Sequence, residues 1–306
     1  MAHDHTHGPG GHLHIDPDAG DRRVFAAIAV NLGLTVAQIV AGLLSGSLAM
    51  IADAVHNLSD AISLVIALVA RRIARRPSDA RMTFGYGRAE MVAALVNYTT
   101  LAVIGLWLVW EGVARLLDPE PVIGWIVVAV AGVALAVDLV TALLTWRMAR
   151  TSENIRAAFL HNLADALGSV GVIVAGTLIL LFGWYVVDAV VTLLIAGYVL
   201  WHVWVGAPRV IAMLMLGAPP GLDAERVLAT MEAVDGVRSV HHLHLWEMQE
   251  GEAAVDAHVV AEPHADAATV RARVAARLHD AFGVGHTTLE MEPAGGACED
   301  AAAIGH

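Results

Sequence analysis

The sequence predicts a membrane domain of six transmembrane α-helices followed by a small cytosolic α+β domain. Of the 306 residues, 57% are hydrophobic and 16% are charged, whereas an average soluble domain is about 45–50% apolar and about 25% charged. Apolar runs of about 20 residues, the length that spans a bilayer core, dominate the chain from Val24 to Val205. This composition is not that of an ordinary soluble enzyme, and the formal net charge of −12 argues against nucleic acid as a partner.

Six apolar runs are the expected transmembrane helices. Helices buried in a soluble core would be shorter and would carry more polar faces. The first 21 residues of the chain are polar and rich in histidine, so we expect no cleavable signal peptide. The six runs are Val24–Leu44, Leu48–Ala70, Ala89–Trp110, Val122–Thr145, Ala157–Leu181 and Tyr185–Val205.

The arginines predict the orientation of these helices. All but one of the arginines that flank the runs lie at the ends that would share one side of the membrane, and the other side has only Arg115. Because positively charged loops stay inside, both termini are expected in the cytoplasm. The inside arginines are Arg22, Arg23, Arg71, Arg72, Arg75, Arg76, Arg81, Arg88, Arg147, Arg150, Arg156 and Arg209.

The chain after Arg209 predicts a separate domain. Its acidic residues outnumber its arginines, and prolines mark the join. Amphipathic and alternating segments follow in the order αββαβ, which is typical of a sheet with helices on one face. They are Asp223–Val234, Val237–Met248, Ala253–Val260, Ala265–Phe282 and His286–Met291. We therefore expect a tail (1–21), a membrane domain (22–207), a cytosolic domain (208–293) and a second tail (294–306).

A histidine and an aspartate four residues apart occur in both the second and the fifth run. The pairs are His56 with Asp60 and His161 with Asp165. Residues at this spacing share a helix face. Six helices divided into two groups of three place the second and fifth in equivalent positions, as in inverted repeats whose sites lie near the midplane.

The repeated pair predicts a shared metal site. The alternative is that these residues cap helices or bind interfacial water. Each aspartate at mid-span costs about 2.5–3.5 kcal/mol to insert, and ionisable residues at that depth are functional by default. Two imidazoles and two carboxylates suit zinc, and two aspartates neutralise one divalent ion.

Other polar residues in the runs have weaker interpretations. Asp53 either guides ions toward the site or is a hydrated residue near the outer end of its helix. Asp138 and Asp188 are expected to make interhelical hydrogen bonds or to mark boundaries. Asn31 and Gln38 in the first run are expected to join helices by hydrogen bonds.

Three stretches resemble the cation diffusion facilitator family of zinc transporters: Gly46–Asp60, Phe84–Glu90 and Ala158–Ser169. The resemblance extends over about residues 20–293. It implies a proton-coupled zinc exporter that works as a homodimer, with a transport site at the two His-Asp pairs. It also implies zinc preference, because members with aspartate in place of the first histidine discriminate less against cadmium.

Histidines also recur on the expected strands of the cytosolic domain. Strand alternation places His242 and His244 on one face and His241 on the other. The resemblance implies a ferredoxin-like, metallochaperone-like domain that binds regulatory zinc near a dimer interface, with His241 and His258 at matching positions. Further candidate ligands are His242, His244, His286, Glu290 and Glu292. The alternative is a set of polar residues on an exposed sheet face.

The N-terminal tail is a third histidine-rich region. Short histidine-rich tracts suggest weak metal capture, and a solvated tail without a role is the alternative. The histidines concerned are His3, His5, His7, His12 and His14.

Three rival functions stay open at this point. A broader exporter would carry cadmium, cobalt or iron as well as zinc. A membrane metalloenzyme would need an open metal position and a general base, but the runs contain no His-Glu-x-x-His and no nucleophile arrangement. A metal sensor without transport would bind metal and show no flux.

Because metal ligands must lose protons to bind, exchange of zinc for protons needs no separate proton pathway.

Overall fold

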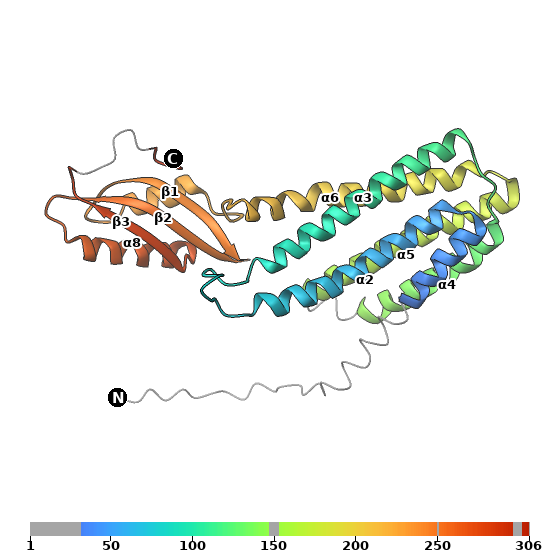
Figure 1. The fold of residues 1–306 in the computed structure, drawn as a ribbon, viewed down its shortest axis with the longest axis horizontal. Coiled ribbons are helices and arrows are strands. Elements are labelled where there is room, and N and C mark those ends of the chain that lie inside the picture. The colour runs from blue at the N-terminus through green and yellow to red at the C-terminus, as the bar shows by residue number, and fades with distance from the viewer. Residues whose placement is uncertain (1–31, 147–152, 250, 296–301, 306) are drawn as a thin grey trace, which may run out of the picture. The chain divides into compact units, whose positions relative to one another are not determined.

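A computed structural model describes residues 32–146, 153–249, 251–295 and 302–305 (Figure 1). Four of its helices are long and apolar enough to cross a membrane, judged by length and composition. They are α2 (Leu48–Ala74), α3 (Ala89–Leu117), α5 (Glu153–Phe182, with the apolar stretch Leu163–Phe182) and α6 (Val186–Leu214). Two further helices are shorter in their described apolar parts: Leu32–Ser45, and Gly124–Val140 of α4 (Gly124–Trp146).

Each of the six predicted apolar runs therefore carries a helix in the described part of the chain. The described residues form two compact units, one within 1–61 and 108–196 and the other within 62–107 and 197–306. The helices α2, α3 and α6 contribute to both units.

The first unit contains an apolar core between helices. Figure 1 shows α4 and α5 side by side, and they pack through buried aliphatic residues. A Cβ atom on Gly124 would lie only 2.6 Å from the carbonyl oxygen of Gly176, so glycine allows the two helices to approach at backbone distance. The core residues are Ala41, Ala49, Met50, Val122, Val127, Ala131, Val172 and Ile179.

In the second unit, the loop between α2 and α3 is ordered by Asp79. Its carboxylate accepts hydrogen bonds from the backbone N–H groups of Arg81 (2.8 Å) and Met82 (2.9 Å) and from the Tyr86 hydroxyl (2.7 Å). These donors, the hydroxyl first, hold the pKa of Asp79 below its usual value. The stretch Phe84–Glu90 is thus a structured entry to α3.

The C-terminal part of the second unit has the predicted αββαβ order. Its elements are α7 (Ala224–Glu232), β1 (Val237–Gln249), β2 (Glu252–Ala261), α8 (Ala267–Phe282) and β3 (His286–Glu292). The strands form one sheet in the order β1-β2-β3, with β1 antiparallel and β3 parallel to β2. A parallel pair needs a crossover connection, and α8 provides it.

Both helices of this domain pack on the sheet to form its core. Figure 1 shows α8 along one face of the strands. Asp223 and Asp266 cap α7 and α8 by accepting backbone hydrogen bonds, and Gly283 ends α8 in the left-handed conformation with φ of 70°. The buried core residues include Val227, Met231, Val240, Leu243, Val255, Val259, Val270, Val274 and Leu278. A domain with its own core is expected to fold alone.

Candidate metal centre

His56 and Asp60 lie on one face of α2, as their spacing predicts. The Nε2 atom of His56 is 3.6 Å from Oδ2 of Asp60. Both side chains are partly buried, with 16% and 28% of their surface exposed. The helix period alone explains this pairing, because residues four apart are neighbours on a helix surface.

Asp165 of α5 completes a three-residue group with this pair. Its Oδ1 atom is 3.5 Å from Nε2 of His56, and one ligand atom from each of the three residues lies within 4.8 Å of the others. The side chain of His161 lies outside the described residues. The sequence spacing of four residues from Asp165 remains the basis for predicting it as a ligand.

The group has the chemistry of a divalent-cation site. One imidazole nitrogen and two carboxylate oxygens come from two helices and converge on a small, partly buried volume. Zinc takes nitrogen and oxygen ligands in a tetrahedral arrangement, and a divalent ion compensates two carboxylates. The described residues supply three donors, and His161 is the predicted fourth.

Three of the other polar residues in these helices make interhelical contacts. Gln38 donates a hydrogen bond of 2.8 Å to Oδ2 of Asp53, and Ser169 donates one of 3.3 Å to Asp138. The expected roles of Gln38 and Asp138 are confirmed. Asp53 is only 4% exposed, so its interpretation as a hydrated residue was wrong. Asn31 lies outside the described residues.

Asp188 and Arg115 make a network that the sequence did not reveal. Asp188 was expected to make an interhelical hydrogen bond, and it accepts one of 2.5 Å from the Ser47 hydroxyl. Its backbone partners on α2 could not be named from sequence because they are more than a hundred residues away. The signal was Arg115, which lies in the last turn of α3 and is an isolated arginine on the side of the membrane where the positive-inside rule predicts few.

A second group lies on the sheet of the C-terminal domain. It consists of His241 on β1, His258 on β2 and Glu292 at the end of β3. The Nδ1 atom of His258 is 2.7 Å from Oε1 of Glu292, and Nε2 of His241 is 3.4 Å from Oε2 of the same residue. The Nε2 atom of His258 is also 3.4 Å from Oε2 of Glu290.

Strand register brings this group together. His241 lies opposite His258, and His258 lies opposite Glu290 in the parallel pair. His241 is 7% exposed, and its Nε2 atom has no hydrogen-bond partner among the described residues. A buried nitrogen of this kind, facing a carboxylate oxygen at 3.4 Å, fits a metal ligand.

His242 corrects the prediction from strand alternation. The register of β1 shifts between His241 and His244, and His242 has a positive φ of 51°. The ring of His242 therefore lies 5.2 Å from that of His241 and 5.0 Å from that of His258 instead of facing away. A β-bulge of this kind re-aims a side chain.

The remaining predicted ligands lie elsewhere. His244 lies opposite Asp256 on the neighbouring strand, and His286 is an exposed residue at the start of β3. Neither belongs to the two ligand groups found among the described residues. The five histidines of the N-terminal tail lie outside those residues.

Comparison with known proteins gives a consistent family assignment for both domains. Residues 24–215 match the family model of a cation efflux transmembrane domain, and residues 219–294 match that of a cation efflux protein cytoplasmic domain.

Curated relatives match along nearly the whole chain. The chain is 38% identical over 299 residues to a zinc transporter, ZitB, of Pectobacterium atrosepticum, covering 95% of this chain and 89% of the relative. It is 35% identical to the metal cation efflux system protein CzcD of Cupriavidus metallidurans, covering 97% and 93%. It is 31% identical to a cadmium, cobalt and zinc/H⁺-K⁺ antiporter of Bacillus subtilis, covering 95% and 92%.

Among solved structures, the metal-bound C-terminal domain of the CzcD transporter of the Cupriavidus species is 30% identical. It aligns with 23% of this chain and 99% of its own length, with a TM-score of 0.23.

Proposed function

Because this chain belongs to the cation efflux family of membrane transporters, we propose that it exports zinc from the cytoplasm in exchange for protons. The chain is a divalent-cation efflux protein and not an enzyme. It is an integral membrane protein with a cytoplasmic C-terminal domain. The observation that carries the finer proposal is the convergence of His56, Asp60 and Asp165 on one small volume.

The proposed transport site is His56, Asp60, His161 and Asp165. In it, a zinc ion as cargo meets two neutral imidazoles and two carboxylates, so that the loaded site carries no formal charge. Charge compensation favours this composition, because an uncompensated divalent ion is strongly disfavoured where water is scarce. Asp53 lies on α2 three residues before His56, and the hydrogen bond that it accepts from Gln38 joins α2 to the helix Leu32–Ser45 close to the proposed site.

The proposed membrane topology has six spans in two inverted groups of three. Two motif-bearing helices, α2 and α5, hold equivalent places in the two groups, which supports this arrangement. The proposed boundaries are a tail (1–21), a transport domain (22–207), a cytosolic domain (208–293) and a second tail (294–306). Both termini lie on the cytoplasmic side of a bacterial inner membrane, and the tail histidines gather metal weakly.

Zinc is proposed as the main cargo on the basis of the ligand set. Imidazole favours zinc over magnesium, calcium and manganese, which prefer all-oxygen sites. The ZitB relative carries the name of a zinc transporter, whereas the Bacillus relative is named for cadmium and cobalt as well. A broader divalent exporter is therefore the second candidate. The antiporter name of the Bacillus relative supports proton exchange.

The test of the proposed function is metal flux in proteoliposomes that contain the full-length protein. Zinc, cadmium, cobalt and iron(II) are each presented with and without an imposed pH gradient. Uphill zinc movement that requires the gradient supports the proposal, and similar rates for all four metals favour the broader exporter. Zinc binding without flux would contradict the proposal and would indicate a metal sensor.

We also propose that the C-terminal domain dimerises and binds regulatory zinc at His241, His258 and Glu292, with Glu290 and His242 at its margin. His241 on β1, His258 on β2 and Glu292 on β3 supply ligand atoms from three different strands. The domain is acidic, so a bound divalent ion also reduces repulsion between two copies. The cytoplasmic-domain match supports dimerisation.

A variant of this domain gives a direct prediction. In an isolated domain of residues 209–306, zinc is expected to raise the melting temperature by several degrees, because ligand that binds only the folded state stabilises by mass action. His258→Ala is expected to remove most of this rise, since His258 contacts both carboxylates. Differential scanning fluorimetry with and without zinc measures the effect. The matched control is His264→Ala, an exposed histidine outside the group, which should keep the full rise. Equal zinc responses in both variants would contradict the assigned ligands.

A further inference from the structure

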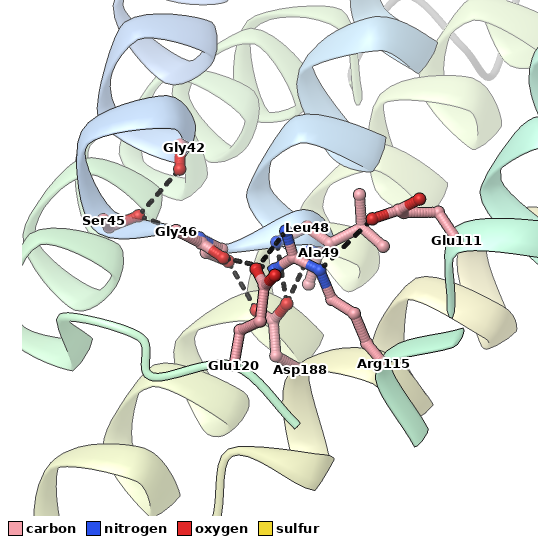
Figure 2. A network of polar contacts seen from close by, with 10 residues as sticks. Gly42, Ser45, Gly46, Leu48, Ala49, Glu111, Arg115, Glu120 and Asp188 are labelled. Atoms are coloured by element: carbon pink, nitrogen blue, oxygen red, sulfur yellow. Dashed lines mark hydrogen bonds and ion pairs between the residues drawn. The ribbon is translucent and has the colours of Figure 1, made fainter. Parts of the chain in front are cut away.

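A buried carboxylate joins the start of α6 to the start of α2. Asp188 lies in the first turn of α6 and is 1% exposed. Its Oδ2 atom accepts hydrogen bonds from the backbone N–H groups of Leu48 (2.7 Å) and Ala49 (3.2 Å), and its Oδ1 atom accepts one of 2.5 Å from the Ser47 hydroxyl. Figure 2 shows this carboxylate directed at the first residues of α2.

These donors are the groups that a helix cannot satisfy by itself. The first N–H groups of a helix have no intrahelical acceptor, and the N-terminal end carries a partial positive charge that favours an anion. Ser47 already caps α2, since the Met50 N–H group donates to its hydroxyl oxygen at 3.1 Å. Asp188 adds a full negative charge from another helix, and the donors in turn make the burial of that carboxylate tolerable.

A residue of α3 also contacts the chain at the start of α2. The Arg115 guanidinium, near the end of α3, donates a hydrogen bond to the carbonyl oxygen of Gly46, the residue that makes the turn before α2. Arg115 is itself paired with Glu120 at 3.1 Å and lies 3.7 Å from Glu111 (Figure 2). The N-terminal end of α2 is thus fixed in rotation and in axial position by α6 and α3 together.

The fixed end matters because α2 carries two of the proposed ligands. His56 follows Leu48 by little more than two helical turns, about 12 Å at a rise of about 1.5 Å per residue. A rotation or slide of α2 at its start therefore moves His56 and Asp60 relative to Asp165 on α5. Metal ligands tolerate deviations of only about 0.2 Å from ideal distances.

We propose that Asp188 is a positioning residue for the metal site, acting through the N-terminal end of α2. The inference rests on the proposed function, because it concerns the zinc ligands on α2. Asp188 touches neither ligand nor metal. It sets the register of α2 against α5 and thereby sets the affinity of the site for zinc.

The test compares Asp188→Asn with the unchanged residue in full-length protein that also carries His258→Ala, so that zinc binding reports the membrane site and not the cytosolic group. The asparagine side chain has the same shape, and its oxygen can still accept from Leu48 and Ala49 while its NH₂ group donates to the Ser47 oxygen, so the main change is the loss of charge. We expect the KM for zinc flux and the zinc Kd from calorimetry to rise about tenfold, the lower part of the range seen when a partner that orients metal ligands is lost. The maximal rate should change much less. Amide hydrogen exchange at Leu48 and Ala49 should be faster.

Thr192→Val is the matched control. Thr192 is a buried residue one turn further along α6, and its hydroxyl donates only to the carbonyl oxygen of Asp188 within its own helix. This variant should keep the wild-type KM. Ser47→Ala, which removes one donor to Asp188 together with the cap of α2 but keeps the carboxylate, should also raise the KM and serves if Asp188→Asn does not fold.

The outcomes separate the two proposals. Faster exchange at Leu48 and Ala49 with an unchanged KM and Kd would overturn the positioning role of Asp188. A rise in KM of the same size in Thr192→Val would also overturn it, because any disturbance of α6 would then suffice. A wild-type protein that binds zinc without transporting it would contradict the proposed function, whereas the comparison of Kd values would still test Asp188.

Discussion

Asp165→Ala is expected to abolish zinc transport while leaving the protein folded. The loss should exceed about a hundredfold, because even partners that only orient metal ligands contribute up to that amount. Asp165 is one of two carboxylates that face His56, at 3.5 Å. Without it, a divalent ion at the site keeps an uncompensated charge and one ligand fewer, in surroundings where solvent cannot replace either. Initial rates of zinc uptake by proteoliposomes measure the effect.

Asp118→Ala is the control for this variant. Asp118 is an exposed aspartate just after the end of α3 and lies outside the proposed site. It should transport zinc at the wild-type rate, and circular dichroism and size-exclusion profiles should be the same for both variants. A correctly folded Asp165→Ala protein with a normal rate would exclude Asp165 as a ligand.

Zinc binding at the proposed transport site should weaken when the pH falls from about 7.5 to about 5.5, the interval in which histidine commonly changes charge. The zinc-bound state requires neutral imidazoles, so it holds fewer protons than the empty state, and acid favours the empty state. Calorimetry in buffers of different ionisation enthalpy gives both the affinity and the number of protons released.

Zinc binding by the cytosolic group of His241, His258 and Glu292 must be removed in this experiment. A His258→Ala background removes a central residue of that group, so that the remaining titration reports the membrane site. Adding Asp165→Ala should then eliminate the zinc signal at either pH. If the zinc affinity did not vary with pH and zinc binding released no protons, proton exchange would be contradicted. The protein would then be a facilitator that moves zinc without exchanging it for protons.

The helices and strands could be predicted from sequence because each has a strong local pattern. Apolar runs marked the starts of α2 and α3, at Leu48 and Ala89, and both helices continue a few residues beyond the predicted ends. The change from long runs to short alternating segments marked the C-terminal domain. The pairing of His56 with Asp60 is a consequence of the helical period. For Asp165, the repeat of the motif supplied the long-range information that a single segment cannot contain.

The remaining features depend on tertiary structure. The bulge in β1 that turns His242 toward His258 has no local signature, since alternation assumes a regular strand. Likewise, nothing near Asp53 in the sequence identifies Gln38 as its partner, and nothing near Asp188 identifies the amides of Leu48 and Ala49. These contacts join segments that only the folded chain brings together.

Asp188 and Arg115 hold α2 at its N-terminal end, so a tilt of the helix turns about Leu48. The helix has 27 residues, a length of about 40 Å, and His56 lies about 12 Å from Leu48 along its axis. A tilt about this point that moves the other end of α2 by about 3 Å therefore displaces His56 by about 1 Å, several times the deviation of about 0.2 Å accepted for a zinc–ligand distance. At the proposed site, a small tilt of α2 is therefore enough to change the distances between the ligands on α2 and Asp165 on α5.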